Sequence, residues 1–167
     1  MNTERIIKGK GRKVRFVLDE EGEKWYSAID VVRAFTDEED YERSRRYWAK
    51  IKKEYFSDKE DDNDIYVNQR GLTASDGKLH MSDVLSHAGI RFVAIYIAIT
   101  FRTKGLYYIN QNDIHKAKDY CERSVYILEN ILGKSHIETV DSLNTLGRIY
   151  GKLGDYDLAI EHFGEDI

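Results

Sequence analysis

An internal repeat in the C-terminal part of the sequence most constrains the fold of this chain. Residues 143–163, LNTLGRIYGKLGDYDLAIEHF, align with residues 101–121, FRTKGLYYINQNDIHKAKDYC, at an offset of 42 residues. The identical pairs include Gly105 and Gly147, Tyr108 and Tyr150, Asp113 and Asp155, and Ala117 and Ala159. Small residues at matching positions allow helices to pack closely, and the chain has no proline to interrupt them. We therefore predict an all-α repeat of helix pairs over residues 90–167.

The first half of the chain follows a different pattern. Apolar residues alternate with charged ones over 14–18, DEEGE supplies a turn, and KWYS returns, which predicts a β-hairpin. Residues 65–74 and 79–85 are predicted strands around the tight turn SDGK. Short helical patterns lie between the strands, so we predict an α+β domain over residues 1–89.

A helix is predicted from about residue 37 to 56. Thr36 and Glu39 have the spacing of a capping box, which would begin this helix. At 100° per residue, Trp48, Ile51 and Tyr55 lie on one side, and cations lie on the other. The aromatic side chains are therefore expected to pack inward.

The cations of this helix and of the basic N-terminal arm form a candidate DNA-binding surface, because lysine and arginine can neutralise phosphates. The candidate residues are Arg43, Arg45, Arg46, Lys50, Lys52, Lys53, Lys10 and Arg12, with Lys8, Lys13 and Arg15 of the arm in support. The alternative is an ordinary solvated face, since charged helix faces usually contact only water and Glu42 and Glu54 dilute this one.

Composition and motifs argue against several other classes of protein. The net charge is −4, and a single cysteine excludes an internal disulfide, which favours a cytoplasmic chain. The longest apolar run, 92–101, is too short to span a membrane. Cys121 aligns with the apolar position 163 and is expected in the core, and neither SDGK nor the histidines have phosphate-loop or metal-ligand spacing. We expect no enzyme activity, no cofactor and no metal site.

Residues 98–167 resemble the tetratricopeptide repeat, and the connector between the two copies resembles the kinesin-light-chain type. The matching positions are Leu143, Leu146, Gly147, Tyr150, Gly154, Tyr156, Ala159 and Phe163. The first copy departs at Lys104 and Asn112, where the pattern prefers an apolar residue and glycine. The resemblance implies a groove that binds a protein or peptide, for which Tyr108, Asn144 and Arg148 are the candidates. The alternative is a short repeat that serves only packing or self-association, for instance in a homodimer.

Three ordered segments, WYSAIDVVRAF, RRYWAKIKKEY and LTASDGKLHMSDVL, resemble the BRO N-terminal domain of viral BRO proteins and prophage antirepressors, especially the version in DNA-damage-inducible protein D. The carried-over positions are Trp25, Tyr26, Asp30, Tyr47, Trp48, Lys52, Asp76, Gly77, Lys78 and Asp83. The resemblance implies a compact α+β DNA-binding domain in a regulator of phage or mobile-element genes. The alternative is an interaction adaptor that does not bind DNA.

Overall fold

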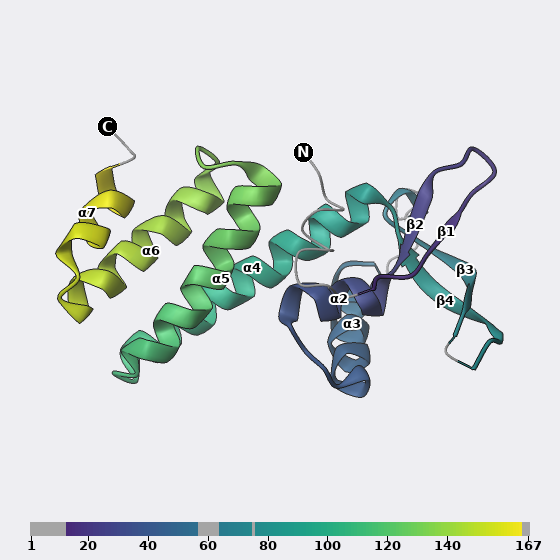
Figure 1. The fold of residues 1–167 in the computed structure, drawn as a ribbon, viewed down its shortest axis with the longest axis horizontal. Coiled ribbons are helices and arrows are strands. Elements are labelled where there is room, and N and C mark those ends of the chain that lie inside the picture. The colour runs from purple at the N-terminus through teal and green to yellow at the C-terminus, as the bar shows by residue number, and fades with distance from the viewer. Residues whose placement is uncertain (1–12, 57–63, 75, 165–167) are drawn as a thin grey trace. The chain divides into compact units, whose positions relative to one another are not determined.

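The structure is a computed structural model that describes residues 13–56, 64–74 and 76–164 (Figure 1). The chain divides into two compact units, an N-terminal unit up to Val93 and a repeat unit from Ala94 onward. The boundary predicted between residues 89 and 90 falls inside α4 (His87–Asn110), a helix to which both units contribute. The domain assignment itself stays a prediction.

The N-terminal unit contains a four-stranded antiparallel sheet in the order β1-β2-β4-β3. Its strands are β1 (Phe16–Leu18), β2 (Lys24–Ser27), β3 (Val67–Thr73) and β4 (Leu79–Leu85). Helices α2 (Ala28–Thr36) and α3 (Tyr41–Tyr55) follow β2 in the chain. The unit is α+β, as predicted.

Local side-chain bonds explain why both predicted hairpins form. In the first turn, the Asp19 carboxylate accepts the backbone N–H groups of Glu21 and Glu23, and Gly22 has a φ of 82°. In the second, Asp76 accepts the N–H of Lys78, and Gly77 has a φ of 76°. Glycine tolerates positive φ without a steric penalty, so these sequences turn the chain where the pattern predicted.

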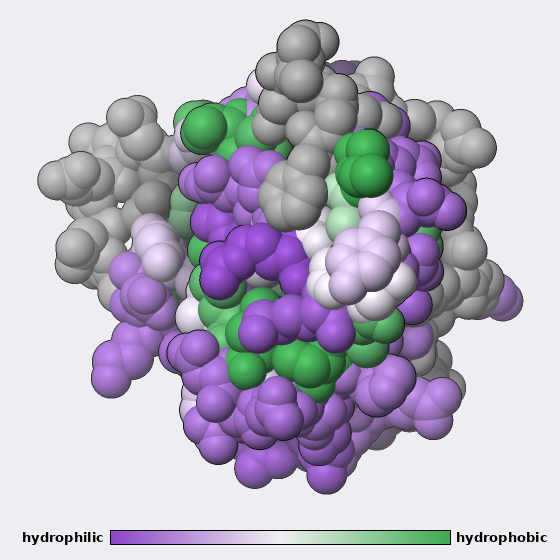
Figure 2. Space-filling model, turned by 90° about the vertical axis from the view of Figure 1, so that its left-hand side faces the viewer, coloured by the Kyte–Doolittle hydropathy of each residue, from purple (hydrophilic) through white to green (hydrophobic). Residues whose placement is uncertain are grey.

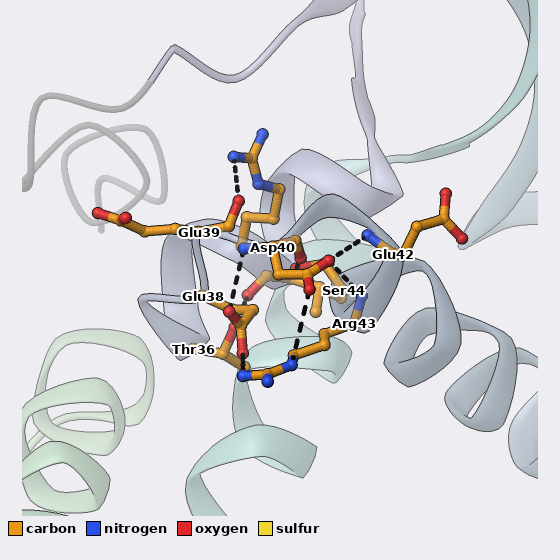
Figure 3. A network of polar contacts seen from close by, with 9 residues as sticks. Thr36, Glu38, Glu39, Asp40, Glu42, Arg43 and Ser44 are labelled. Carbon is orange, nitrogen blue, oxygen red and sulfur yellow. Dashed lines mark hydrogen bonds and ion pairs between the residues drawn. The ribbon is translucent and has the colours of Figure 1, made fainter.

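The predicted start of α3 was wrong, and Figure 3 shows the reason. The Thr36 hydroxyl donates to the carbonyl of Val32 at 2.7 Å within α2 and does not cap α3. Asp40 caps α3, because its Oδ1 accepts the backbone N–H groups of Glu42 at 2.8 Å and Arg43 at 3.1 Å. A carboxylate directly before the first turn satisfies two free donors and complements the helix dipole.

The core of the N-terminal unit joins α2, α3 and the sheet. Its buried apolar residues include Tyr26, Val31, Val32, Phe35, Trp48, Ile51, Leu72, Val84 and Leu85. Trp48 and Ile51 therefore point inward, as predicted. Tyr55 lies on the same side of the helix but is 44% exposed, and its ring contacts that of Phe92 with 5.2 Å between centroids.

The repeat unit consists of two helix pairs (Figure 1). The part of α4 within this unit pairs with α5 (Ile114–Leu132), and α6 (Ile137–Leu153) pairs with α7 (Tyr156–Gly164). The turns inside the two pairs have the same geometry. The N–H of Asp113 donates to the carbonyl of Tyr108 at 3.0 Å, and the N–H of Asp155 donates to that of Tyr150 at 3.0 Å. The 42-residue repeat is thus a repeat of structure.

The first copy has Asn112 where the second copy has a glycine, and the backbone conformation of Asn112 explains why the turn still forms. Asn112 has a φ of 59°, and the aligned Gly154 has a φ of 81°. Asparagine is among the few non-glycine residues that enter the left-handed region readily. The turn is therefore preserved without the glycine.

Small residues hold α4 and α5 close together. A Cβ atom added to Gly105 would collide with the Sγ atom of Cys121 and would lie 3.2 Å from the carbonyl oxygen of Ala117. Cys121 is fully buried in a cluster that also contains Ala117, Leu143, Leu146 and Ile149. The expectation that Cys121 belongs to the core is confirmed.

Candidate functional site

The predicted DNA-binding cations of α3 fall into separate groups. Arg43 lies 3.8 Å from Glu38 and 3.7 Å from Asp40, and Arg45 lies 3.4 Å from Glu42. These exposed ion pairs are weak, and they leave the guanidinium groups accessible.

Arg46, Lys50 and Lys53 lie exposed on α3. Within residues 13–56, 64–74 and 76–164, neither Arg46 nor Lys50 forms an ion pair with an acidic side chain. Lys10 and Arg12 lie outside the described residues. The outward face of α3 therefore carries several exposed cations of the predicted set, of which Arg46 and Lys50 lie outside any ion pair among the described residues.

Lys52 contacts the sheet rather than standing on the outward face. Its Nζ atom lies 2.8 Å from Oδ1 of Asp83 on β4. The same carboxylate accepts the indole N–H of Trp48 at 2.7 Å and the side-chain amide of Gln69 at 2.9 Å. Burial by itself raises the pKa of Asp83, but the hydrogen bonds from Lys52, Trp48 and Gln69 outweigh it and hold the pKa below its usual value.

Arg15, expected to support a basic arm, is also committed to the fold. Its Nε and Nη2 atoms donate to the two carboxylate oxygens of Asp30 at 2.7 Å and 3.0 Å. Asp30 is buried near the start of α2. A bidentate pair of this kind fixes both position and orientation, so Arg15 holds the chain before β1 against α2.

A cleft of about 490 Å³ opens between α3 and the β3–β4 hairpin. The volume falls within the range of small-ligand sites. Its lining combines cations, hydroxyl groups and apolar side chains: Arg15, Ser27, Ile29, Tyr41, Arg45, Trp48, Ala49, Lys52, Gln69, Leu72, Ala74, His80, Met81, Ser82 and Asp83. Nothing in the sequence pattern indicated this cleft, because its walls come from segments far apart in the chain.

The structure places the predicted partner-binding residues of the repeat in two environments. Tyr108 is half-buried and stacks on Tyr120 of α5, with 5.5 Å between ring centroids and 4° between planes. Asn144 and Arg148 lie one turn apart on α6, and Arg148 is exposed. Their role in binding stays a prediction.

An ion-pair bridge between α4 and α6 had no signal in the sequence pattern. Arg102 of α4 contacts Glu138 at 2.9 Å and Asp141 at 3.7 Å, and its Nη1 atom also donates to the Glu138 carbonyl. Nearby, Ser124 of α5 donates to the carbonyl of Ala98 and hydrogen-bonds Ser142 of α6 at 3.1 Å. These contacts fix the first helices of the two pairs relative to each other.

The end of the repeat unit that carries α7 has a different surface. Figure 2 shows apolar side chains there between hydrophilic ones. On α7, Tyr156 is 67% exposed and Ile160 is 68% exposed.

The single cysteine and the metal-ligand side chains of the described residues bear on catalysis and metal binding. Burial raises the pKa of the Cys121 thiol to about 11, so a thiolate nucleophile is disfavoured at neutral pH. Within the described ranges, no group of three or more histidine, cysteine or acidic side chains could hold a metal ion. Among the helices of the same ranges, none is both long and apolar enough to cross a membrane.

Comparison with known proteins identifies one region. Residues 96–165 match the family model of the tetratricopeptide repeat. This agrees with the resemblance predicted over residues 98–167 and with the two helix pairs. No curated protein and no solved structure matches the chain. The C-terminal region is a helical repeat of a type that generally mediates protein–protein interactions, and the matched residues do not include β1–β4, α2 or α3.

Proposed function

We propose that this protein binds a protein segment or peptide through the first helices of its two repeats. The observation that carries the proposal is the tetratricopeptide match over two structurally equivalent helix pairs. The side of α6 bearing Asn144 and Arg148 offers an amide and a guanidinium one turn apart, a pair suited to backbone carbonyls and carboxylates. Tyr108 contributes by packing α4 against α5, through the stacking of its ring on that of Tyr120.

Selection from a random peptide library on the full chain, followed by fluorescence polarisation with the selected peptides, tests this function. Arg148→Ala and Asn144→Ala should each weaken binding about tenfold, because each removes a directional hydrogen bond. Asn130→Ala, an exposed change on α5, is the matched control and should leave affinity unchanged. Equal affinities for all three variants would reject α6 as the binding surface.

A second function, DNA binding by the N-terminal unit, is favoured by the accessible Arg46 and Lys50 on α3. Their exposure suits contacts with phosphates, which are independent of base sequence. The resemblance of the three N-terminal segments to the BRO N-terminal domain supports the same proposal. On this proposal the chain is a regulator or antirepressor-like protein, in which α3 contacts DNA and the repeats recruit a partner or a second copy.

A salt titration of binding to duplex DNA tests the second function. The triple variant Arg46→Ala, Lys50→Ala, Lys53→Ala should weaken binding and reduce the slope of log affinity against log salt by about 2–3, one per lost phosphate contact. The pair Lys116→Ala and Lys118→Ala, which lies on α5, is the control. Affinity that responds neither to salt nor to the triple change leaves the adaptor role as the function of the whole chain.

A further inference from the structure

The cleft between α3 and the β3–β4 hairpin carries the further inference, and its walls are of two kinds. Trp48, Leu72 and Ile29 provide an apolar floor, and Met81 extends this surface outward with 68% exposure. Arg15, Arg45 and Lys52 provide cationic groups around it. A ligand that fits would have an apolar body and at least one hydrogen-bond acceptor.

The lining has more hydrogen-bond donors than acceptors. Asp83 is the one carboxylate among the lining residues, and both of its oxygens already accept hydrogen bonds. A guanidinium has five N–H groups, and Asp30 accepts two of those of Arg15. The Tyr41 hydroxyl adds a further donor, whereas the Ser82 hydroxyl already donates to the carbonyl of His80 at 3.3 Å. An incoming anion would therefore find donors that the cleft itself does not saturate.

Arg45 is the cation best placed to respond to a ligand. Its side chain is 65% exposed, and the one ion pair that it forms within the described residues, with the equally exposed Glu42, is long at 3.4 Å. Such a pair gives little stability, so the guanidinium can turn toward an anion in the cleft at small cost. Arg43 has almost the same exposure and similar ion pairs but does not line the cleft.

We propose that this cleft binds a small organic anion, a carboxylate or phosphate monoester attached to an aromatic or apolar body. The apolar part packs against Trp48, Leu72 and Met81, and the anionic group accepts hydrogen bonds from Arg45 and Lys52 at the opening. This site does not include Arg46, Lys50 or Lys53, and its lining residues all belong to the N-terminal unit, so it goes beyond the two functions proposed above.

The two tryptophans give a direct assay on the full chain. The Trp48 indole N–H bonds Asp83 inside the cleft, whereas the Trp25 indole N–H bonds Asp19 and does not line it. In ¹H–¹⁵N spectra, naphthalene-1-acetate and 1-naphthyl phosphate should each shift the Trp48 indole signal saturably and leave that of Trp25 in place. The neutral naphthalene-1-acetamide should bind at least about tenfold more weakly, because it lacks the charge-assisted hydrogen bond.

Variants distinguish the cleft from general adsorption. Arg45→Gln should weaken both anions at least about fivefold, while the matched Arg43→Gln changes affinity less than about twofold. Ala49→Trp should block the cleft and abolish the Trp48 shift, while Ala88→Trp, an exposed alanine of α4, should not. Circular dichroism verifies that the variants fold, and Arg45→Gln, on an exposed side chain, provides the test if Ala49→Trp does not.

The outcomes are separable. Tighter binding of the naphthyl phosphate assigns a phosphate ligand, and tighter binding of the acetate assigns a carboxylate. The proposal is overturned if neither anion gives a saturable Trp48 shift, if the amide binds as well as the anions, or if Arg45→Gln and Arg43→Gln behave alike.

Discussion

The N-terminal unit and the repeat unit solve the problem of holding their elements together in different ways. In the N-terminal unit, single carboxylates collect donors from separate segments, as Asp83 does from Trp48, Lys52 and Gln69. In the repeat unit, small residues such as Gly105 allow close helix contact, and equivalent backbone bonds occur twice.

This difference teaches what each unit tolerates. A carboxylate with three donors is a unique site, so its loss leaves the buried Trp48 indole and the partly or fully exposed Lys52 and Gln69 side chains without that acceptor. At a helix contact made by a small residue, the space available for a side chain is the constraint. The loss of stability caused by a substitution there therefore depends on the size of the added group. Both tryptophans lie in the N-terminal unit, so indole fluorescence follows that unit while far-ultraviolet circular dichroism follows mainly the helices.

The largest effect is expected for Asp83→Ala. The change leaves the Trp48 indole, the Lys52 ammonium and the Gln69 amide without their shared acceptor, and it should lower the free energy of unfolding by about 2–4 kcal/mol. Urea unfolding followed by tryptophan fluorescence at pH 7 measures this loss. Asp76→Ala, on the exposed turn of the same hairpin, is the control and should cost much less.

The same variant has a predicted pH dependence. The pKa of Asp83 is lower in the folded protein, so its contribution is present at neutral pH and is lost as pH falls through the ordinary carboxyl range toward the folded pKa. The difference in stability between wild type and Asp83→Ala should therefore shrink on going from pH 7 to about pH 3. A difference that stays constant with pH would contradict an ionised, hydrogen-bonded Asp83.

The next largest effect is expected for Gly105→Ala in the repeat unit. The new methyl group would collide with Cys121, and the resulting overpacking should cost about 1–3 kcal/mol. Gly151→Ala is the matched control, since a Cβ there meets no atom within 4 Å and α6 should gain up to about 1 kcal/mol. Thermal unfolding followed by circular dichroism measures both changes, and equal effects would reject close packing at Gly105.

A smaller effect is expected for Asp40→Ala at the start of α3. Loss of the two capping hydrogen bonds should lower the Tm by roughly 3–6 °C. Glu39→Ala, which removes the acid of the predicted capping box, should change the Tm by no more than about 1 °C. If the two substitutions have reversed effects, the helix begins as the sequence pattern indicated and not at Asp40.

How much of the structure the sequence predicts differs between the two units. The repeat was predictable because its signals recur, so each copy supports the other. In the N-terminal unit the local sequence patterns correctly predicted both hairpin turns. They also correctly predicted that Trp48 and Ile51 point inward. The start of α3 was mispredicted because two candidate caps lie within five residues, and spacing alone does not decide which side chain reaches the free N–H groups.

The roles of individual charged residues could not be predicted in this way. Lys52 is one of several similar cations in RRYWAKIKK, and only the fold brings it to Asp83, 31 residues away. Arg15 pairs with Asp30 for the same reason. Helical periodicity separates an inward from an outward face, but it does not identify the side chain on the border that crosses to another element. The cleft depends on the same tertiary contacts.

The smallest expected effect tests whether the two repeat turns are equivalent. Asn112 and Gly154 occupy the same place in their helix pairs and share a left-handed backbone. Asn112→Gly should stabilise the first turn by about 0.5 kcal/mol, and Gly154→Asn should destabilise the second by a similar amount, because asparagine tolerates this region less well than glycine. The double exchange should then nearly cancel in the free energy of unfolding, measured by urea titration with circular dichroism. A large net change would mean that the side chain of Asn112 has a role that its backbone geometry does not explain, and the two copies would be alike in shape but not in stability.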